Sequence, residues 1–367
     1  MGTRGLRIVI LGLTITSSWG NGHATTYRGL MRGLVRRGHR VLFLERDKPW
    51  YAEHRDLPQP PYGETALYDE PEALARRWGH AIETADLVIV GSYVPDGIEV
   101  AALVQRLARG ATAFYDIDTP VTLAALEAGT CTYLSPETLR RFDLYLSFTG
   151  GTTLDELQTR WGARAARALY CSADPTLYRP DPDAAARWDL GYLGTYSTDR
   201  QPVLDALLCQ PAGAEPERRF VVAGPLYPDG LAWPGNVERI EHLAPGEHSA
   251  FYAGQRFTLN VTRADMVRRG WSPSVRLFEA ACCGVPIISD WWPGLDELFR
   301  PGEEILIARD TDDVLRFLRD TSQARRQQIG RAAQARVLSA HTGDHRAAEL
   351  EQYAIDALPA MRPRATA

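Results

Sequence analysis

The sequence predicts an α/β protein built from two domains with parallel sheets, and three observations lead to this prediction. The chain has 367 residues, which is long for a single hydrophobic core. Its N-terminal part contains a strand, a helix and a second strand in succession, which is how a parallel sheet with right-handed crossovers begins. After a segment with three prolines, a second series of strands and helices starts.

The first half of the chain alternates short apolar runs with helical sequence. The elements expected there are a buried strand at 7–13, a glycine-containing loop at 14–22, a helix at 23–37 ended by Gly38, and strands at 40–45, 87–90, 113–117 and 144–148. Residues 49–62 are rich in proline and aromatic side chains, so we expect a long loop there. Long loops in compact domains are often functional, which makes this one a candidate acceptor-binding segment.

The second half repeats the alternation after residues 172–182, whose prolines indicate an interdomain linker. The strands expected there lie at 189–195, 219–224, near 237, and at 257–261, 285–288 and 305–307. Charge-rich helical sequence fills residues 312–358.

Composition excludes several classes of function. Hydrophobic residues make up 45% of the chain and charged residues 24%, as in ordinary globular proteins, and the net charge is −5. A mildly acidic chain lacks a general basic surface, so we expect no nucleic-acid partner. No run of 18 apolar residues occurs, so we expect no transmembrane segment. The five cysteines show no CxxC spacing, which argues against a structural zinc site and favours a cytoplasmic protein.

The most informative segment runs from Trp271 to Asp290. Ser272 is a natural N-cap and Pro273 suits the first helical position, so a helix should begin there and end at Gly284. The free N–H groups of Ser272–Ser274 and the helix dipole would suit a phosphate. Arg276 and Glu279 are three residues apart and therefore share a helix face. They are either ligands of a nucleotide, with the glutamate at the ribose, or an ordinary surface ion pair.

This segment resembles the donor-site helix of group 1 glycosyltransferases, whose pattern is E-A-x-A-x-G-x-P-x-I. Here the pattern falls on Glu279, Ala280, Gly284, Pro286 and Ile288. The resemblance is closest to the spore-maturation-protein (CgeB-like) branch, which has S-P-S-x-R-x-F-E-A. It implies the GT-B architecture, two facing Rossmann-like domains with the nucleotide sugar held mainly by the second and the last helix crossing back to the first. On this basis we expect an N-terminal domain at 1–172, a linker at 173–185, a nucleotide-sugar domain at 186–343, and a C-terminal helix and tail at 344–367.

The same resemblance implies further donor-binding residues. In the family, the loop after the first strand of the second domain approaches the diphosphate, with a basic residue just beyond it. The donor-binding candidates outside the helix are Gly194, Thr195, Tyr196, Arg200, Gly224, His242 and Arg268. Gly224 and His242 would lie near the base, and arginine suits the leaving diphosphate. For the Gly194 loop, the alternative is a plain strand-to-helix turn. Arg263 and Arg269 are alternatives to Arg268 as the arginine that binds the leaving diphosphate.

One position departs from the large retaining family. That family has a second glutamate, which contacts the sugar, eight residues before the helix glutamate. This chain has Trp271 there, so the ribose role carries over to Glu279 but the recognition of the sugar does not. The donor sugar therefore stays open.

The catalytic candidates are His23 and Asp118. Gly20, Gly22 and His23 open the first helix, where glycines let the backbone approach a phosphate and Gly22 would also contact the donor. Asp118 lies after a strand, in D-I-D-T-P, where it could serve as acceptor base or orienting group. For His23 the alternative is local bonding; for Asp118 it is capping of the turn, or a metal site shared with Asp116.

Together these observations predict a metal-independent glycosyltransferase without cofactor, using a nucleoside diphosphate sugar, an unknown acceptor and retention of configuration. Two other functions stay open. An NAD(P)-dependent oxidoreductase would use Gly20, Gly22 and, at the ribose, Glu45. A nucleotide-binding scaffold without turnover would explain Trp271.

Overall fold

The computed structural model describes residues 5–19 and 22–358, which form two compact units. The described residues up to Cys171 and from Gly343 onward form unit 1, and residues 172–342 form unit 2. Each unit contains one parallel sheet with helices, so the predicted class of two Rossmann-like domains is confirmed. The predicted linker at 173–185 is counted within unit 2, and the chain returns to unit 1 at Gly343.

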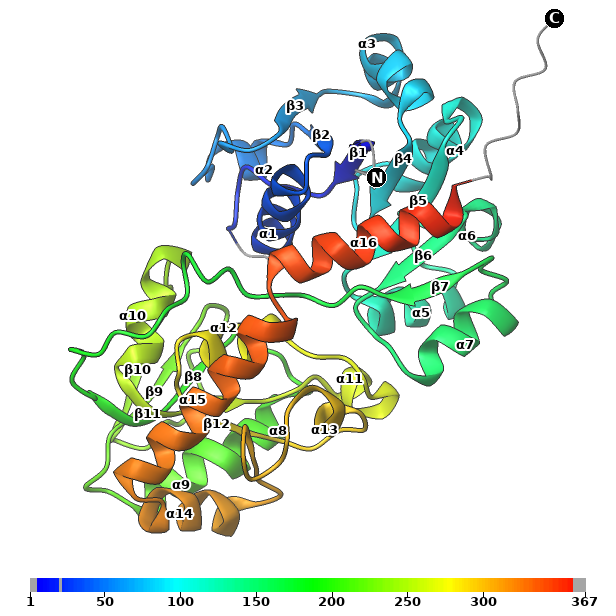
Figure 1. The fold of residues 1–367 in the computed structure, drawn as a ribbon. Coiled ribbons are helices and arrows are strands. Elements are labelled where there is room, and N and C mark those ends of the chain that lie inside the picture. Colours follow the sequence, from blue (N-terminus) through cyan, green and yellow to red (C-terminus); the bar gives the residue numbers. More distant parts are fainter. Residues whose placement is uncertain (1–4, 20–21, 359–367) are drawn as a thin grey trace, which may run out of the picture. The chain divides into compact units, whose positions relative to one another are not determined.

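Unit 1 contains a sheet of seven parallel strands in the order β3-β2-β1-β4-β5-β6-β7 (Figure 1). The strands are β1 (Arg7–Gly12), β2 (Arg40–Arg46), β3 (Glu64–Tyr68), β4 (Leu87–Gly91), β5 (Ala111–Asp116), β6 (Leu144–Ser147) and β7 (Ala166–Ala168). The helices are α1 (His23–Arg36), α2 (Pro49–Ala52), α3 (Pro71–Thr84), α4 (Gly97–Leu107), α5 (Thr119–Glu127), α6 (Pro136–Arg141), α7 (Thr152–Thr159) and α16 (Gly343–Ala357).

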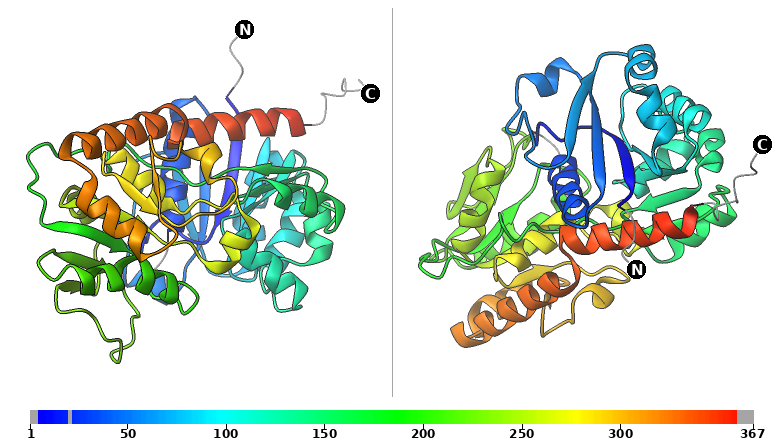
Figure 2. Two further views of the ribbon diagram at one scale, coloured as in Figure 1. Left: turned by 90° about the horizontal axis from the view of Figure 1, so that it is seen from below. Right: turned by 45° about the horizontal axis from the view of Figure 1, so that its top comes forward.

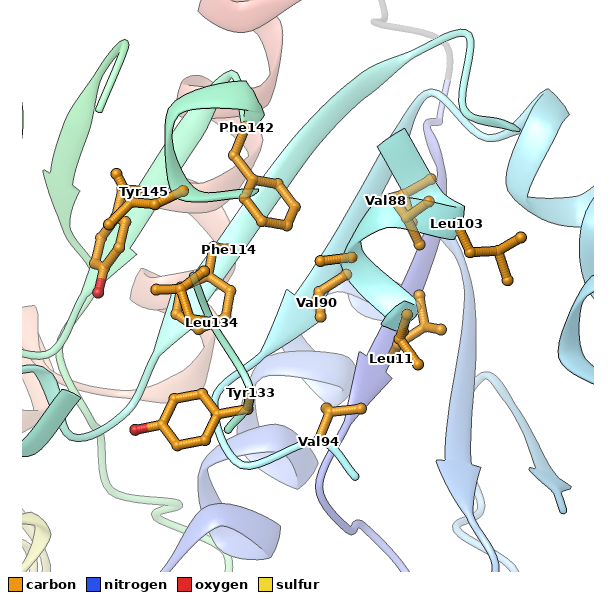
Figure 3. Close-up of a cluster of buried hydrophobic side chains, with 14 of the residues drawn as sticks. Leu11, Val88, Val90, Val94, Leu103, Phe114, Tyr133, Leu134, Phe142 and Tyr145 are labelled. Atoms are coloured by element: carbon orange, nitrogen blue, oxygen red, sulfur yellow. The ribbon is translucent and has the colours of Figure 1, made fainter. Parts of the chain in front are cut away.

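Both faces of this sheet are buried, as the apolar runs predict. Along β1, Ile8 and Ile10 belong to one hydrophobic cluster, whereas Val9 and Leu11 belong to another. Figure 3 shows the second cluster, in which the rings of Tyr133 and Tyr145 lie at the margin and turn their hydroxyl groups away from the aliphatic side chains. Those hydroxyl groups take part in the polar site described below.

The C-terminal helix packs on the first helix of the chain. α16 lies beside α1 in both Figure 1 and Figure 2, and Ala347 is fully buried between them. Two glycines allow the close approach, because a Cβ on Gly33 would lie 2.6 Å from the carbonyl oxygen of Gly343. The predicted return of the last helix to the first domain is therefore confirmed.

Unit 2 contains six parallel strands in the order β10-β9-β8-β11-β12-β13. The strands are β8 (Trp188–Leu193), β9 (Phe220–Ala223), β10 (Val237–Ile240), β11 (Gln255–Asn260), β12 (Ile287–Ser289) and β13 (Leu306–Ile307). The helices are α8 (Gln201–Leu204), the π-helical turn Asp205–Cys209, α9 (Gln210–Ala214), the 3₁₀ turn Pro245–Glu247, α10 (His248–Ala253), α11 (Ala264–Arg269), α12 (Val275–Cys282), α13 (Leu295–Leu298), α14 (Thr311–Asp320) and α15 (Gln323–Ala340). Among the helices described in either unit, none has the length and apolar character needed to cross a bilayer.

One prediction about local structure is wrong, and one strand was missed. Residues 49–62 are not all loop, because α2 begins at Pro49, which fixes the backbone of a first helical turn. The strand β3, which follows this segment, was not expected from the sequence. It is an edge strand in which Tyr68 alone is fully buried, so it lacks the apolar run that marks the inner strands.

The strand order places a switch point in each sheet. It lies between β1 and β4 in unit 1, and between β8 and β11 in unit 2. Parallel sheets bind ligands outside the carboxyl ends of the strands at such points. We therefore expect the site residues of each unit at the carboxyl ends of these strands.

Candidate functional site

In unit 2, the side chain of Arg276 lies at the switch point, among neutral partners. The arginine is 9% exposed, and its guanidinium donates to the carbonyl of Leu193 at the end of β8 and to Asn260 Oδ1 at the end of β11, the latter at 3.0 Å. It also lies over the ring of Tyr192, 4.8 Å from its centroid. Among the residues that the structure describes, no carboxylate contacts it directly, so its positive charge is held in place by neutral groups.

The helix that carries Arg276 begins later than predicted. α12 starts at Val275 with Ser274 as N-cap, two residues after the expected cap at Ser272. Ser274 keeps an extended backbone and donates its hydroxyl to Asn260 Oδ1 at 2.8 Å. Ser272 and Pro273 thus belong to the loop before the helix, and the N–H groups at the helix start follow Ser274.

A second arginine, Arg200, lies near Arg276. It follows β8, and its Nη2 donates to the carbonyl of Thr195 at 2.6 Å. Burial lowers the pKa of Arg200, and the positive charge of Arg276 lowers it further. Among the described residues, Arg200 Nε is buried without a hydrogen-bond partner, and neither arginine forms an ion pair. Two cations without a partner of opposite charge favour an anion at this edge of the sheet.

Two predicted glycines are packed tightly beside these arginines. A Cβ on Gly194 would lie 2.8 Å from Arg276 Nη2, and one on Gly224 would lie 2.1 Å from the carbonyl oxygen of Gly194. Gly224 has φ +141, a conformation that side chains rarely adopt. The loop is closed by Tyr227, whose hydroxyl donates to Gly194 O at 3.1 Å and whose ring contacts Tyr196 at 5.5 Å.

Glu279 lies one turn after Arg276 on α12 but has different partners. It is 4% exposed and accepts a hydrogen bond from the hydroxyl of Tyr252 at 3.5 Å. Burial and the charge of Glu279 raise the pKa values of Tyr178 and Tyr252, so both phenols stay protonated. The alternative of an exposed Arg276–Glu279 surface pair is therefore wrong, since both side chains are buried.

Two other donor candidates are exposed. The side chain of Arg268, in α11, is 69% exposed and pairs with Asp265 one turn earlier. His242 is an exposed residue after β10. Asn260, which binds both Ser274 and Arg276, was not predicted. A polar residue that ends an apolar strand was the only signal for it in the sequence.

In unit 1, His23 is the first residue of α1 and Gly22 its N-cap. Burial lowers the pKa of His23 to about 4, so the imidazole is neutral at neutral pH. Its ring meets the ring of Tyr93 edge-on, with centroids 5.5 Å apart. Gly20 lies outside the described residues.

The two aspartates of D-I-D-T-P have different environments. Asp116 is fully buried, and its carboxylate accepts hydrogen bonds from Tyr145 at 2.5 Å, Thr122 at 2.7 Å and the backbone N–H of Asp118 at 3.2 Å. Its lone pairs are therefore committed to the protein rather than to a metal. Over the described part of the chain, no three His, Cys, Asp or Glu side chains are grouped so that they could hold a metal ion.

Asp118 is partly exposed. It occupies the N-cap position of α5, yet its side chain makes no capping hydrogen bond. Instead Asp118 Oδ2 accepts the hydroxyl of Tyr93 at 3.2 Å. The alternative that Asp118 caps the turn with its side chain is therefore wrong.

The buried Asp116 makes stability dependent on pH. Burial raises its pKa from 3.8 to about 6, so between these values the folded state binds the proton more tightly than the unfolded state. We expect the unfolding free energy of unit 1 to fall by on the order of 3 kcal/mol as pH rises from about 4 to 6, and to level off above. Chemical denaturation across this range should show that slope in the wild type and lose it in Asp116→Asn. Asp69→Asn, at an exposed position, should retain it.

Glu45 cannot serve as the ribose-binding acid of a dinucleotide site. It is fully buried, and one carboxylate oxygen accepts the N–H groups of Ile15 and Thr16 while the other accepts the Thr16 hydroxyl at 2.7 Å. It therefore shapes the loop after β1 from inside. The oxidoreductase alternative loses its ribose ligand.

Comparisons with known proteins indicate the class of enzyme and the fold. Residues 200–352 match a family described as "Glycosyl transferase-like", a range that includes Arg200, Asn260 and the whole of α12. A search of curated proteins by sequence found no match.

Solved structures resemble the chain over nearly its whole length. Sucrose-phosphate synthase from Thermosynechococcus elongatus is 15% identical with a TM-score of 0.65, over 95% of this chain and 98% of that one. Anabaena Alr3699/HepE in complex with UDP is 14% identical with a TM-score of 0.70, over 96% and 100%. An alpha-glucosyltransferase in complex with UDP and DNA is 15% identical with a TM-score of 0.68, over 96% and 99%.

At such identities the structural likeness shows a shared fold, which is the GT-B fold predicted from the sequence. The family match supplies the class of enzyme. By the fold of both units and the family match of residues 200–352, the chain is a glycosyltransferase.

Proposed function

We propose that this enzyme transfers a sugar from a uridine diphosphate sugar to an acceptor hydroxyl or amine, without a metal ion and with retention of configuration. The observation that carries the proposal is the pair Arg200 and Arg276, which have no ion pair among the described residues. Uridine is proposed because structures of similar fold contain UDP or UDP-glucose.

Negative charge develops on the diphosphate as the bond to the sugar breaks. Arg200 and Arg276 would stabilise that charge, with help from the N–H groups at the start of α12. Arg276 is already oriented by Leu193 and Asn260, so little reorganisation is needed during the reaction. Positive groups fixed in this way would provide what a metal ion provides in other transferases.

In unit 2, the tight loop of Gly194, Thr195 and Tyr196 would contact the donor through the backbone, and Gly224 and His242 would lie near the base. Glu279 would bind the ribose, since a buried carboxylate held by two tyrosines has a fixed orientation. Arg268 would take a peripheral part, because its charge is paired with Asp265.

On the acceptor side, His23 and Asp118 would orient the attacking group. With retention, the attacking hydroxyl and the leaving phosphate lie on the same face of the sugar, so the phosphate oxygen can take the proton. Retention and membership of the spore-maturation branch rest on the resemblance of residues 272–280. In place of the family's second glutamate, Trp271 has φ +43 and donates its N–H to Pro293 O at 2.6 Å, so its backbone is fixed.

Thermal melts test the donor site directly. Ligand at about 100 times Kd adds roughly 2.7 kcal/mol to the stability of the unit that binds it, so UDP should raise a melting transition by several degrees. The rise should persist in EDTA and be weaker with GDP, dTDP, ADP and NAD(P). Stabilisation by NAD(P) alone, or by UDP only in the presence of a divalent metal, would contradict the proposal.

Glu279→Gln should weaken UDP binding at least tenfold, because the amide has one acceptor oxygen where the carboxylate has two. The exposed Glu303→Gln in the same unit is the control and should bind UDP as the wild type does. Equal UDP affinities in the two variants, measured by calorimetry, would remove Glu279 from the site.

Turnover and stereochemistry require a separate measurement. Release of UDP from UDP-glucose distinguishes an enzyme from a binding scaffold. Proton NMR of the glucose formed first should show the α-anomer, as retention requires. Formation of the β-anomer would overturn retention and make Asp118 or His23 the base.

A further inference from the structure

Tyr93 lies where the two predicted catalytic residues of unit 1 meet. Its hydroxyl is 3.2 Å from Asp118 Oδ2, and its ring contacts the imidazole of His23 at 5.5 Å. His23 begins α1, which follows β1, and Asp118 precedes α5, which follows β5. The two residues therefore lie after the carboxyl ends of two different strands. Tyr93 follows β4, which lies beside β1 at the switch point of the sheet.

The backbone at Tyr93 has a conformation that a tyrosine rarely adopts. Its φ is +62, and three residues later Asp96 has φ +56. Strained residues of this kind persist only where surrounding structure holds them, and they cluster at functional sites. Glycine would occupy position 93 without strain, so the side chain that is present calls for an explanation.

The turn that contains Tyr93 is held on several sides. Arg46 at the end of β2 forms an ion pair with Asp96 at 3.2 Å, and Val94 is buried in the hydrophobic cluster of Figure 3. Ser92 is bound to β5 through its N–H, which donates to Tyr115 O at 2.9 Å, and its hydroxyl, which accepts the N–H of Ile117 at 3.1 Å. The backbone of the turn that carries Tyr93 is thus held by contacts with two neighbouring strands, β2 and β5.

A buried polar network supports the ring of Tyr93 through Tyr133. The ring of Tyr133 packs on Tyr93 with centroids 4.6 Å apart, and the Tyr133 hydroxyl bonds to Thr122 at 2.8 Å. Thr122 donates to the buried Asp116 at 2.7 Å. Burial, together with the charges of Asp118 and Asp116, raises the pKa of Tyr93, so its phenol keeps its proton and donates to Asp118.

We infer that Tyr93 is a positioning residue, which orients the Asp118 carboxylate and the His23 ring toward the acceptor group. The inference rests on the proposed function of the two residues that it orients. It adds a residue that the sequence motifs do not contain. Its role is to fix one carboxylate oxygen with a hydrogen bond and to set the imidazole against an aromatic edge.

Tyr93→Phe tests the inference, because it keeps the ring and removes only the hydroxyl. The matched control is Tyr353→Phe, since the Tyr353 hydroxyl donates to the backbone carbonyl of Ala168 at 3.1 Å, within the same unit. We expect Tyr93→Phe to release UDP from UDP-glucose about tenfold more slowly than the wild type, the loss typical of a hydrogen bond to a charged group. Its affinity for UDP should be unchanged, and the control should behave as the wild type.

A second readout does not depend on activity. A phenol that donates to a carboxylate stabilises the ionised form, so the stability that it contributes is present at neutral pH and is lost as the carboxylate is protonated. The melting temperatures of wild type and Tyr93→Phe should therefore differ more at pH 7 than at pH 4. For Tyr353→Phe the difference should not change with pH.

The outcomes separate the inference from the proposed function. Wild-type turnover in Tyr93→Phe, or a stability difference independent of pH, would overturn the positioning role. If the wild type releases no UDP from UDP-glucose or any other UDP-sugar, the proposed function fails. The pH dependence of stability then still decides whether Tyr93 orients Asp118.

Discussion

Arg276→Met is expected to lower kcat for UDP release from UDP-glucose by about 10²–10³, the cost of losing one preorganised donor at a developing negative charge. The guanidinium is fixed by Leu193 and Asn260 and by the ring of Tyr192. Arg276→Lys should recover only part of the rate. An ammonium keeps the positive charge but lacks the planar set of N–H donors with which the guanidinium bonds to Leu193 O and Asn260 Oδ1. Steady-state kinetics with UDP-glucose measure both variants.

Arg268→Met is the matched control, since it removes an arginine from the same unit whose guanidinium is exposed and paired with Asp265. Its kcat should stay within about threefold of the wild type, as expected for an exposed ion pair. Arg200→Met should resemble Arg276→Met, and the double variant should lose less than the product of the two effects. A larger loss in Arg268→Met than in Arg276→Met would place the leaving diphosphate at α11.

Gly224→Ala is expected to destabilise unit 2 by about 3 kcal/mol or more, which is a fall of roughly 6–12 °C in its melting transition. A Cβ at this position would lie 2.1 Å from the carbonyl oxygen of Gly194, and the backbone conformation, with φ +141, is one that alanine rarely adopts. The neighbour that would have to move is backbone, so the clash cannot be relieved by a side-chain rotation. Differential scanning calorimetry resolves the two units if they melt separately.

Gly235→Ala provides the control in the same unit. No atom lies within 4 Å of a Cβ built there, and its φ is not in the left-handed region. The substitution should be neutral, or stabilise by less than about 1 kcal/mol through the unfolded state. Equal melting temperatures for the two alanine variants would show that the Gly194–Gly224 contact does not constrain the donor loop.

The fold was predictable because inner strands of parallel sheets must be apolar on both faces. Residues 8–11 and 87–90 show this directly, and the structure buries every one of them. The edge strand β3 was missed for the same reason, since only Tyr68 of its five residues is fully buried. The motif at residues 272–288 indicated the class of enzyme, but the residue at which the helix begins was predicted two positions too early. The helix begins after Ser274, whose hydroxyl is bound to Asn260 at the end of β11, and the local sequence does not show this contact.

By itself, the sequence determined the two parallel sheets, because the periodicity of apolar residues marks their strands. The contiguous motif at residues 272–288 indicated a glycosyltransferase, and the resemblance that it carries implied the return of the last helix. The tertiary structure decided which charges act together. It brought Arg276 to the carbonyl of Leu193, 83 positions away, and left Arg268 at the surface. It also committed Glu45 and Asp116 to buried hydrogen bonds and placed Tyr93 between His23 and Asp118. The physical reason is that a side chain's charge and orientation are set by neighbours distant in sequence, and only the folded chain brings these together.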